Sequence, residues 1–260
     1  MSYLHLRTPL WTAVDMVAST GSTNADLLAR ASADRDIPEG QVLVADEQTA
    51  GRGRLGRSWT SAPGASLTFS VLLRPASVPA ARRGWLPLLT GVAVAEAVRA
   101  VSGVDAVLKW PNDVLAGDRK LAGILAEQSQ DGSALVVGVG LNVATPEDDL
   151  PVSPSGLPAT SLLVEGAHVG RDDVLLDILR HLERWYLQFR ADPDPEGSGL
   201  LAAYRALCAT LGRDVRVELP ANQVLEGVAE DIDADGCLLV RPAGASTVTR
   251  VSAGDVVHVR

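Results

Sequence analysis

The chain has 260 residues, of which 47% are hydrophobic, so it can bury the core of one large domain and still form a small second one. No apolar run approaches membrane-spanning length, and the N-terminus lacks a basic region followed by a long apolar stretch, so we expect neither a membrane anchor nor a secretory signal. The net charge of −9 argues against a general nucleic-acid binder. The two cysteines, Cys208 and Cys237, have no metal-ligand spacing, which favours a cytoplasmic protein without structural zinc or a disulfide framework.

The first predicted helix follows the sequence STGSTN, residues 19–24. Thr23 is a suitable N-cap, and Asp26 is placed three residues later as its capping-box partner. Ser22, Thr23 and Asn24 either only cap this helix or also contact a ligand. Capping explains one hydroxyl and leaves the polar side chains beside it without a role.

Residues 51–57 read GRGRLGR and lie between two segments, 42–45 and 66–73, that are typical of buried strands. Glycine loses much entropy on ordering, and permanent charges so close together do not suit a core. We therefore expect a loop that is mobile when empty and is ordered by an anionic ligand. The alternative is a solvated, glycine-rich hairpin.

The same loop matches G-x-G-x-x-G at Gly51, Gly53 and Gly56, but neither common meaning of that pattern fits. A dinucleotide-binding fold needs a helix to begin directly after the glycines, and here Pro63, Gly64 and a strand follow. A protein kinase would carry HRD and DFG further on, and neither is present.

Next, the sequence predicts a helix over residues 86–101 and strands near residues 106–116, 120–128 and 133–143. The turns between these strands contain the dipeptides GD and DG, which are strong hairpin signals, so we expect an antiparallel meander. The last of these strands is a candidate edge that pairs with another subunit.

Residues 145–159 are rich in proline and acids and are predicted to form a surface loop. Residues 171–190 predict a long amphipathic helix and residues 200–211 a shorter one. The short strands after them suffice for a small barrel. The sequence thus predicts an α+β fold, a mixed and largely antiparallel sheet flanked by helices, in a catalytic domain over residues 1–211 with a β-barrel over residues 212–260.

Lysine is rare in this chain: of 23 basic residues only Lys109 and Lys120 are lysines, which suggests sites that require a compact ammonium group. Both lie in the predicted meander, within KWPND and RKLAG, and GVGLN follows on the next strand. Pro111 interrupts the strand and leaves Asn112 and Asp113 in a bend. Such a set can hold a triphosphate and its magnesium; the alternative is a turn with two solvated lysines.

Four segments in this order, QTAGRGRLGRSW, KWPNDV, RKLAGIL and GVGLNV, resemble the signature segments of biotin–protein ligases, and STGSTN before the helix matches as well. The resemblance runs from about Ser19 to Asn142 and extends loosely to the C-terminal barrel. It implies a class II synthetase-like catalytic domain and an SH3-like barrel. Because family members that repress transcription carry an N-terminal helix-turn-helix domain, the resemblance is to the ligase-only form, and we expect no DNA binding.

The family reaction has two steps. The biotin carboxylate attacks the α-phosphate of MgATP to give biotinyl-5′-adenylate and pyrophosphate, and a lysine of a biotin carboxyl carrier domain then attacks this mixed anhydride. The residues carried over by the resemblance are Lys120 and Arg54 as catalytic groups on the carboxylate and α-phosphate; Ser22, Thr23 and Gln48 with the backbone of Gly51 and Arg52 at the ureido ring; Asn112 and Asp113 for ATP and magnesium; Asn142 at the adenine side; Trp59 as a cover; and Asn24, Gly53, Lys109 and Gly138 as further binding residues. Catalysis would then be positioning and charge stabilisation.

Other functions remain to be compared with this one. Lipoate–protein ligases share the fold and reaction type, but GRGRLG and KWPND favour biotin. A non-catalytic module that binds biotin or its adenylate would not need Lys120 and Asp113, and a DNA-binding regulator is disfavoured by the net charge. The expected partners are biotin, ATP and a carrier domain of a biotin-dependent carboxylase, with no membrane, for a monomer or a weak homodimer.

Overall fold

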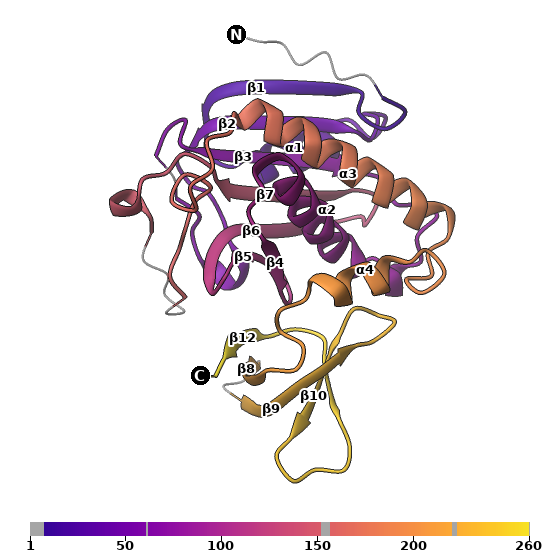
Figure 1. Cartoon of the computed structure of the whole chain (residues 1–260). Helices are drawn as coiled ribbons and strands as arrows, with labels where there is room; N and C mark the ends of the chain where they lie inside the picture. Colours follow the sequence, from indigo (N-terminus) through magenta and orange to yellow (C-terminus); the bar gives the residue numbers. More distant parts are fainter. Residues whose placement is uncertain (1–7, 61, 152–156, 220–222, 260) are drawn as a thin grey trace.

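The computed structural model describes residues 8–60, 62–151, 157–219 and 223–259, and it contains two sheets (Figure 1). The larger sheet has seven strands in the order β1-β2-β3-β7-β6-β5-β4, with β1 parallel to β2 and every other pair antiparallel. This bears out the expected mixed, largely antiparallel sheet. Its strands are β1 (Ala13–Thr20), β2 (Gln41–Gln48), β3 (Ser66–Leu73), β4 (Ala106–Lys109), β5 (Asp113–Ala116), β6 (Arg119–Gln128) and β7 (Leu135–Asn142).

Strand β7 lies at the centre of this sheet, between β3 and β6, so the expectation of an edge strand over residues 133–143 is wrong. Nearly all of its residues are buried, as in a strand that is covered on both faces. The strand expected over residues 106–116 is interrupted at Pro111, as expected, but Asp113 begins the next strand and does not lie in the bend. The chain reverses at the cis Trp110–Pro111 bond, so that β4 and β5 form a hairpin with Lys109 opposite Asp113.

Helices cover both faces of the large sheet. Helix α1 (Thr23–Ala33) packs Leu27 and Ala31 against one face, and α2 (Trp85–Ser102) lies on the other face beneath α3 (Arg171–Ala191). The N-cap of α1 is Ser22, whose hydroxyl accepts from the Ala25 N–H, and not Thr23 as the sequence suggested. The backbone turns helical one residue earlier than expected, which frees the Thr23 hydroxyl for other contacts.

By length and composition α2 resembles a membrane span, contrary to the expectation from the sequence. However, 67% of its most apolar window is buried inside the protein. It therefore serves as the core helix between the sheet and α3 (Figure 1).

The smaller sheet follows a short helix, α4 (Leu200–Leu207), which ends four residues before the sequence predicted. Its five strands have the order β11-β10-β9-β8-β12 and form the C-terminal barrel in orange and yellow in Figure 1. Two tryptophans of the large domain donate to the turn between β9 and β10: Trp85 Nε1 to the Ala234 carbonyl (2.8 Å) and Trp110 Nε1 to that of Gly236 (3.0 Å). The strands are β8 (Asp214–Leu219), β9 (Gln223–Ile232), β10 (Leu238–Pro242), β11 (Thr249–Val251) and β12 (Asp255–His258).

Candidate active site

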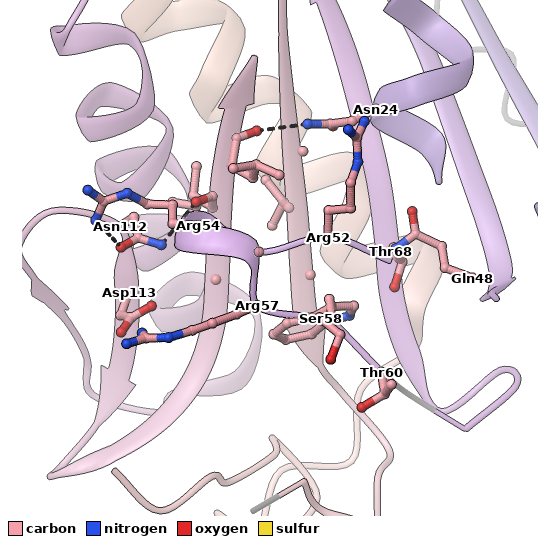
Figure 2. A pocket seen from close by; sticks show the side chains of 18 of the residues that line it. Asn24, Gln48, Arg52, Arg54, Arg57, Ser58, Thr60, Thr68, Asn112 and Asp113 are labelled. Carbon is pink, nitrogen blue, oxygen red and sulfur yellow. Dashed lines mark hydrogen bonds between the residues drawn. The ribbon is translucent and has the colours of Figure 1, made fainter. Parts of the chain in front are cut away.

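A cavity of about 380 Å³ lies on the α1 face of the large sheet, beneath the glycine loop of residues 51–57. The start of α1 forms one end, the turn after β4 forms the other, and the bare middle of β6 and β7 forms the floor. Figure 2 shows side chains of the loop and of these strands around it. The three motifs that are separated in sequence therefore meet in one place.

The end next to α1 holds a buried polar network. Gln48 Oε1 accepts from the Thr23 N–H (2.8 Å) and is 3.0 Å from the Thr23 hydroxyl. The same hydroxyl lies 2.6 Å from Ser70 Oγ, which donates to Asn24 Oδ1 (2.6 Å). All of these groups except Gln48 are at most 6% exposed, so this part of the cavity wall is well fixed.

The glycine loop is drawn together at its base. The Trp59 N–H donates to the Gly51 carbonyl (2.9 Å), and the Gly53 N–H donates to the carbonyl of Arg57 (2.7 Å). A Cβ on Gly51 would lie 2.4 Å from the Trp59 oxygen, so only glycine fits there. The expectation that this loop is mobile without ligand stays a prediction.

The three arginines of the loop reach three different parts of the protein. Arg52 pairs with Glu127 of β6 (3.1 Å), Arg54 donates to Asn112 Oδ1 (3.1 Å), and Arg57 pairs with Asp255 of the barrel. Figure 2 shows Arg54 joined to Asn112. Burial lowers the pKa of Arg54, whereas the hydrogen bond that Arg57 donates to Asp255 raises the pKa of Arg57.

At the opposite end of the cavity, Asp113 lies between Lys120, which lines the cavity, and Lys109, which is buried outside its lining. Lys120 Nζ is 2.6 Å from Asp113 Oδ1, and Lys109 Nζ is 3.8 Å from Oδ2. Lys109 is only 6% exposed, and its burial lowers its pKa, while the charge of Asp113 opposes that shift. Two ammonium groups and a carboxylate at this end form a site suited to a polyphosphate.

The floor of the cavity is formed by glycine residues, because the Trp59 ring lies directly on it. A Cβ on Gly140 would lie 2.3 Å from that ring, and one on Gly123 would lie 3.5 Å from it. Trp59 Nε1 is buried without a hydrogen-bond partner among the described residues. At the far end of β7, Asn142 donates to the Thr160 carbonyl (2.9 Å) and accepts from Ser66 (3.3 Å).

With this geometry in view, known proteins were compared with the chain. The model of the "Biotin/lipoate A/B protein ligase family" matches residues 17–143, and that of the "Biotin protein ligase C terminal domain" matches residues 210–259. The biotin–[acetyl-CoA-carboxylase] ligase of Mycobacterium tuberculosis is 48% identical over 96% of this chain and 90% of its own length. The chain belongs to the biotin protein ligase family.

Two further relatives support this assignment to the biotin protein ligases. The bifunctional ligase/repressor BirA of Bacillus subtilis is 31% identical over 87% of this chain and 67% of its own length. The biotin protein ligase of Aquifex aeolicus in complex with biotin and ATP has a TM-score of 0.77 and 28% identity, over 95% of this chain and 98% of that chain. The SH3-like barrel and the synthetase-like domain expected from the sequence are thereby confirmed.

The structure brings nearly all of the residues named from the biotin protein ligase motifs to one cavity. Gly51 and Lys109 are the exceptions: Gly51 is buried at the base of the loop, and Lys109 is buried beside Asp113. The predicted site residues that line the cavity are Ser22, Thr23, Asn24, Gln48, Arg52, Gly53, Arg54, Trp59, Asn112, Asp113, Lys120, Gly138 and Asn142.

Sequence reasoning missed the residues that come from outside the motifs. Asp255 reaches the cavity from the barrel and pairs with Arg57, although the two are 198 positions apart. Ser70 and Glu127 hold Asn24 from within two ordinary strand patterns. The available signal for Ser70 was the alternation of hydroxyls at Ser66, Thr68 and Ser70 in an otherwise apolar strand, since buried polar groups need partners.

Proposed function

We propose that this chain is a biotin–protein ligase that activates biotin with MgATP to biotinyl-5′-AMP and then transfers biotin to a lysine of a carrier domain. The observation that carries the proposal is one cavity with a neutral polar network at one end and a cationic set at the other. Biotin has the same polarity, because its ureido ring and its carboxylate lie at opposite ends of the molecule.

The polar end offers the hydrogen-bonding groups that a cyclic urea requires. Ser70 donates its proton to Asn24 Oδ1, so the Thr23 hydroxyl has two acceptors for its own proton, Ser70 Oγ and Gln48 Oε1. Thr23 thus presents only lone pairs to a ligand, which suits an N–H group. Gln48 uses its oxygen on Thr23 and keeps its NH₂ group for a ligand carbonyl. The dithiolane ring of lipoate has neither an N–H nor a C=O.

The cationic end explains how two anions can meet. A carboxylate is already the ionised nucleophile at neutral pH, so the first step needs no general base. It does need cations between the carboxylate and the phosphate. Arg54 and Lys120 both line the cavity and supply them. Burial removes part of the hydration of the Arg54 guanidinium and thereby lowers its pKa, so an anionic ligand oxygen would restore interactions that water no longer supplies.

Magnesium fits the same end of the cavity. Among the described residues, no group of three or more His, Cys, Asp or Glu is arranged to hold a metal ion, so the metal would be held by Asp113 and by phosphate oxygens of ATP. One carboxylate with substrate phosphates is a common arrangement for Mg²⁺. The ion would neutralise phosphate charge during attack.

The second step requires an amine to reach the same cavity. We infer that the acceptor is the lysine of a biotin carboxyl carrier domain, in a cytoplasmic protein that is a monomer or a weak homodimer without DNA binding. We also assign residues 1–211 to the ligase domain and residues 212–260 to the barrel, because the strands of the second sheet begin at Asp214.

Pyrophosphate exchange into ATP, measured with biotin and with lipoate in parallel, tests the proposed function. Exchange should depend on biotin, and Thr23→Val should weaken biotin more than ATP because it removes the acceptor for the ureido N–H. Equal or faster exchange with lipoate would overturn the assignment to biotin. Binding of biotin without any exchange would favour a non-catalytic binding module.

A further inference from the structure

Asn24 is held more rigidly than a ligand-contacting side chain needs to be. Its Nδ2 donates to the Leu125 carbonyl (3.1 Å) and to Glu127 Oε2 (2.8 Å). Both partners only accept hydrogen bonds, so the NH₂ group must face them and Oδ1 must face Ser70. Asn24 is 3% exposed, and a Cβ on Gly138 would lie 2.3 Å from its Oδ1. The amide is therefore fixed on every side.

Glu127 links this fixed amide to the glycine loop. One carboxylate oxygen, Oε2, accepts from Asn24, and the other, Oε1, lies 3.1 Å from Arg52 Nη1. The Glu127 side chain is 24% exposed and that of Arg52 is 46% exposed. The Asn24 contact already holds the carboxylate in place, so pairing with Arg52 costs less side-chain conformational entropy. This strengthens a partly exposed ion pair.

Arg52 is the first arginine of the glycine loop, and its position determines that of the residues that close the base of the loop. Its backbone forms a bridge with Ser58 across the loop, next to the Gly51–Trp59 hydrogen bond. An anchor at Arg52 thus holds both sides of the loop above the end of the cavity that contains Thr23 and Gln48.

We propose that Glu127 is a positioning residue that couples the polar end of the cavity to closure of the glycine loop. Its carboxylate is held by Asn24 and in turn holds Arg52, and it contacts no reacting atom. This inference rests on the proposed function, since the closed loop would retain biotinyl-adenylate between the two steps. It assigns the first loop arginine a different task from Arg54, which faces the ATP end.

Glu127→Gln tests the link because glutamine keeps an acceptor for Asn24 but removes the charge that pairs with Arg52. Adenylate should still form, and it should dissociate roughly tenfold faster, as expected for loss of a charged hydrogen bond. Trypsin should also cut the loop at its arginines faster in the ligand-free variant. Glu226→Gln is the matched control, because it removes the same charge from a pair with Arg216 (3.7 Å) within the barrel; both readouts should stay at wild-type rates.

A double-mutant cycle separates coupling from general damage. Arg52→Gln should reproduce the faster release, and the double variant Arg52→Gln/Glu127→Gln should be no faster than either single variant. Additive effects, or wild-type release by Glu127→Gln, would overturn the inference. If Glu127→Gln fails to fold, Arg52→Gln tests the same pair from its more exposed side. Absence of any adenylate in the wild type would instead refute the proposed function, and the proteolysis comparison would still decide the role of Glu127.

Discussion

Asp113 is the residue on which the cationic end of the cavity depends. It pairs with Lys120 at 2.6 Å and Lys109 at 3.8 Å, and its charge also raises the pKa of Arg54 against the larger effect of burial. One carboxylate therefore keeps several cations close together in a partly buried site before a nucleotide arrives. Removing its charge, or changing the shape of a cation beside it, should have larger effects than similar changes at the protein surface.

Lys120→Arg keeps the positive charge but replaces a compact ammonium with a wider planar group. Lys120 Nζ lies 2.6 Å from Asp113 Oδ1, and the wider guanidinium of arginine cannot take the place of this ammonium group without moving that carboxylate. We expect biotinyl-adenylate formation to fall by about 100-fold, the effect of losing one positioned donor to transition-state charge. Pyrophosphate exchange measures the rate, and a thermal melt close to wild type shows that the fold is kept. A variant with near-normal exchange would remove Lys120 from the catalytic role.

Asp113→Asn removes the proposed contact with magnesium and leaves the buried Lys109 without its ion-pair partner. MgATP affinity should fall far more than biotin affinity, because the proposed position of the biotin ring is at the other end of the cavity. Calorimetric titrations with each ligand give the two dissociation constants separately. Unchanged MgATP binding together with lost biotin binding would place Asp113 in a different part of the site.

At the scale of elements, the floor of the cavity depends on two neighbouring strands. Gly123 of β6 and Gly140 of β7 lie directly opposite each other in the ladder. Together they leave a patch without side chains, and the Trp59 ring occupies the space above it. This cross-strand pair explains why both motifs contain a glycine in the interior of a strand.

The two glycines give a matched pair of variants. Gly140→Ala places a Cβ 2.3 Å from the Trp59 ring and must displace it, whereas Gly123→Ala meets the ring at 3.5 Å, an ordinary contact. We expect Gly140→Ala to weaken biotin binding by about tenfold, within the range for overpacking of a fixed site. Gly123→Ala should bind nearly as well as wild type. Calorimetry on both variants decides the question, and equal loss in the two would mean that Trp59 does not fix the ligand.

At the scale of the whole molecule, the barrel is part of the active site. Asp255 of β12 reaches Arg57 of the glycine loop, and the barrel also contacts the segment that precedes Asp113 through Trp110. His258, on the same strand, lies between Thr210 and Arg213. Burial first, and then the charge of Lys109, lowers its pKa to about 4.

This pKa predicts a loss of stability in acid. Between the ordinary value of 6.5 and about 4, the unfolded chain binds a proton at His258 that the folded protein does not bind. Unfolding therefore becomes easier as the pH falls through that window, and His258 has no such effect above it. Thermal melts of wild type and His258→Gln at pH 7 and pH 5 should show a smaller decrease in Tm for the variant. Equal decreases would mean that His258 is protonated normally in the folded protein.

The sequence predicted the site better than it predicted the sheet. The motifs that contain Asp113 and Lys120 have unusual compositions, from which a chemical role can be inferred. The turns at Gly117 and Gly132 have the positive φ that their dipeptides indicate. Strand β1 was not predicted, since its alternation is weak and mostly exposed. The central place of β7 depends on pairing with β3, which is distant in sequence. No local pattern could place Asp255 beside Arg57 either, because their contact depends on how the two domains pack.

The attachment of the barrel has a consequence for exchanging parts between related proteins. The indoles of Trp85 and Trp110 donate to backbone carbonyls of the barrel, those of Ala234 and Gly236, and not to side chains. These two hydrogen bonds depend on the backbone path of the turn and not on most of its side chains. Gly236 must be retained for its φ of 82°. Barrels from distant relatives should therefore be interchangeable on this domain as long as the turn keeps its shape. Such a chimera would also have to keep the acids at positions 231, 235 and 255. Asp231 and Asp235 pair with Arg205 and Arg82 of the large domain, and Asp255 alone enters the cavity from the barrel among the described residues.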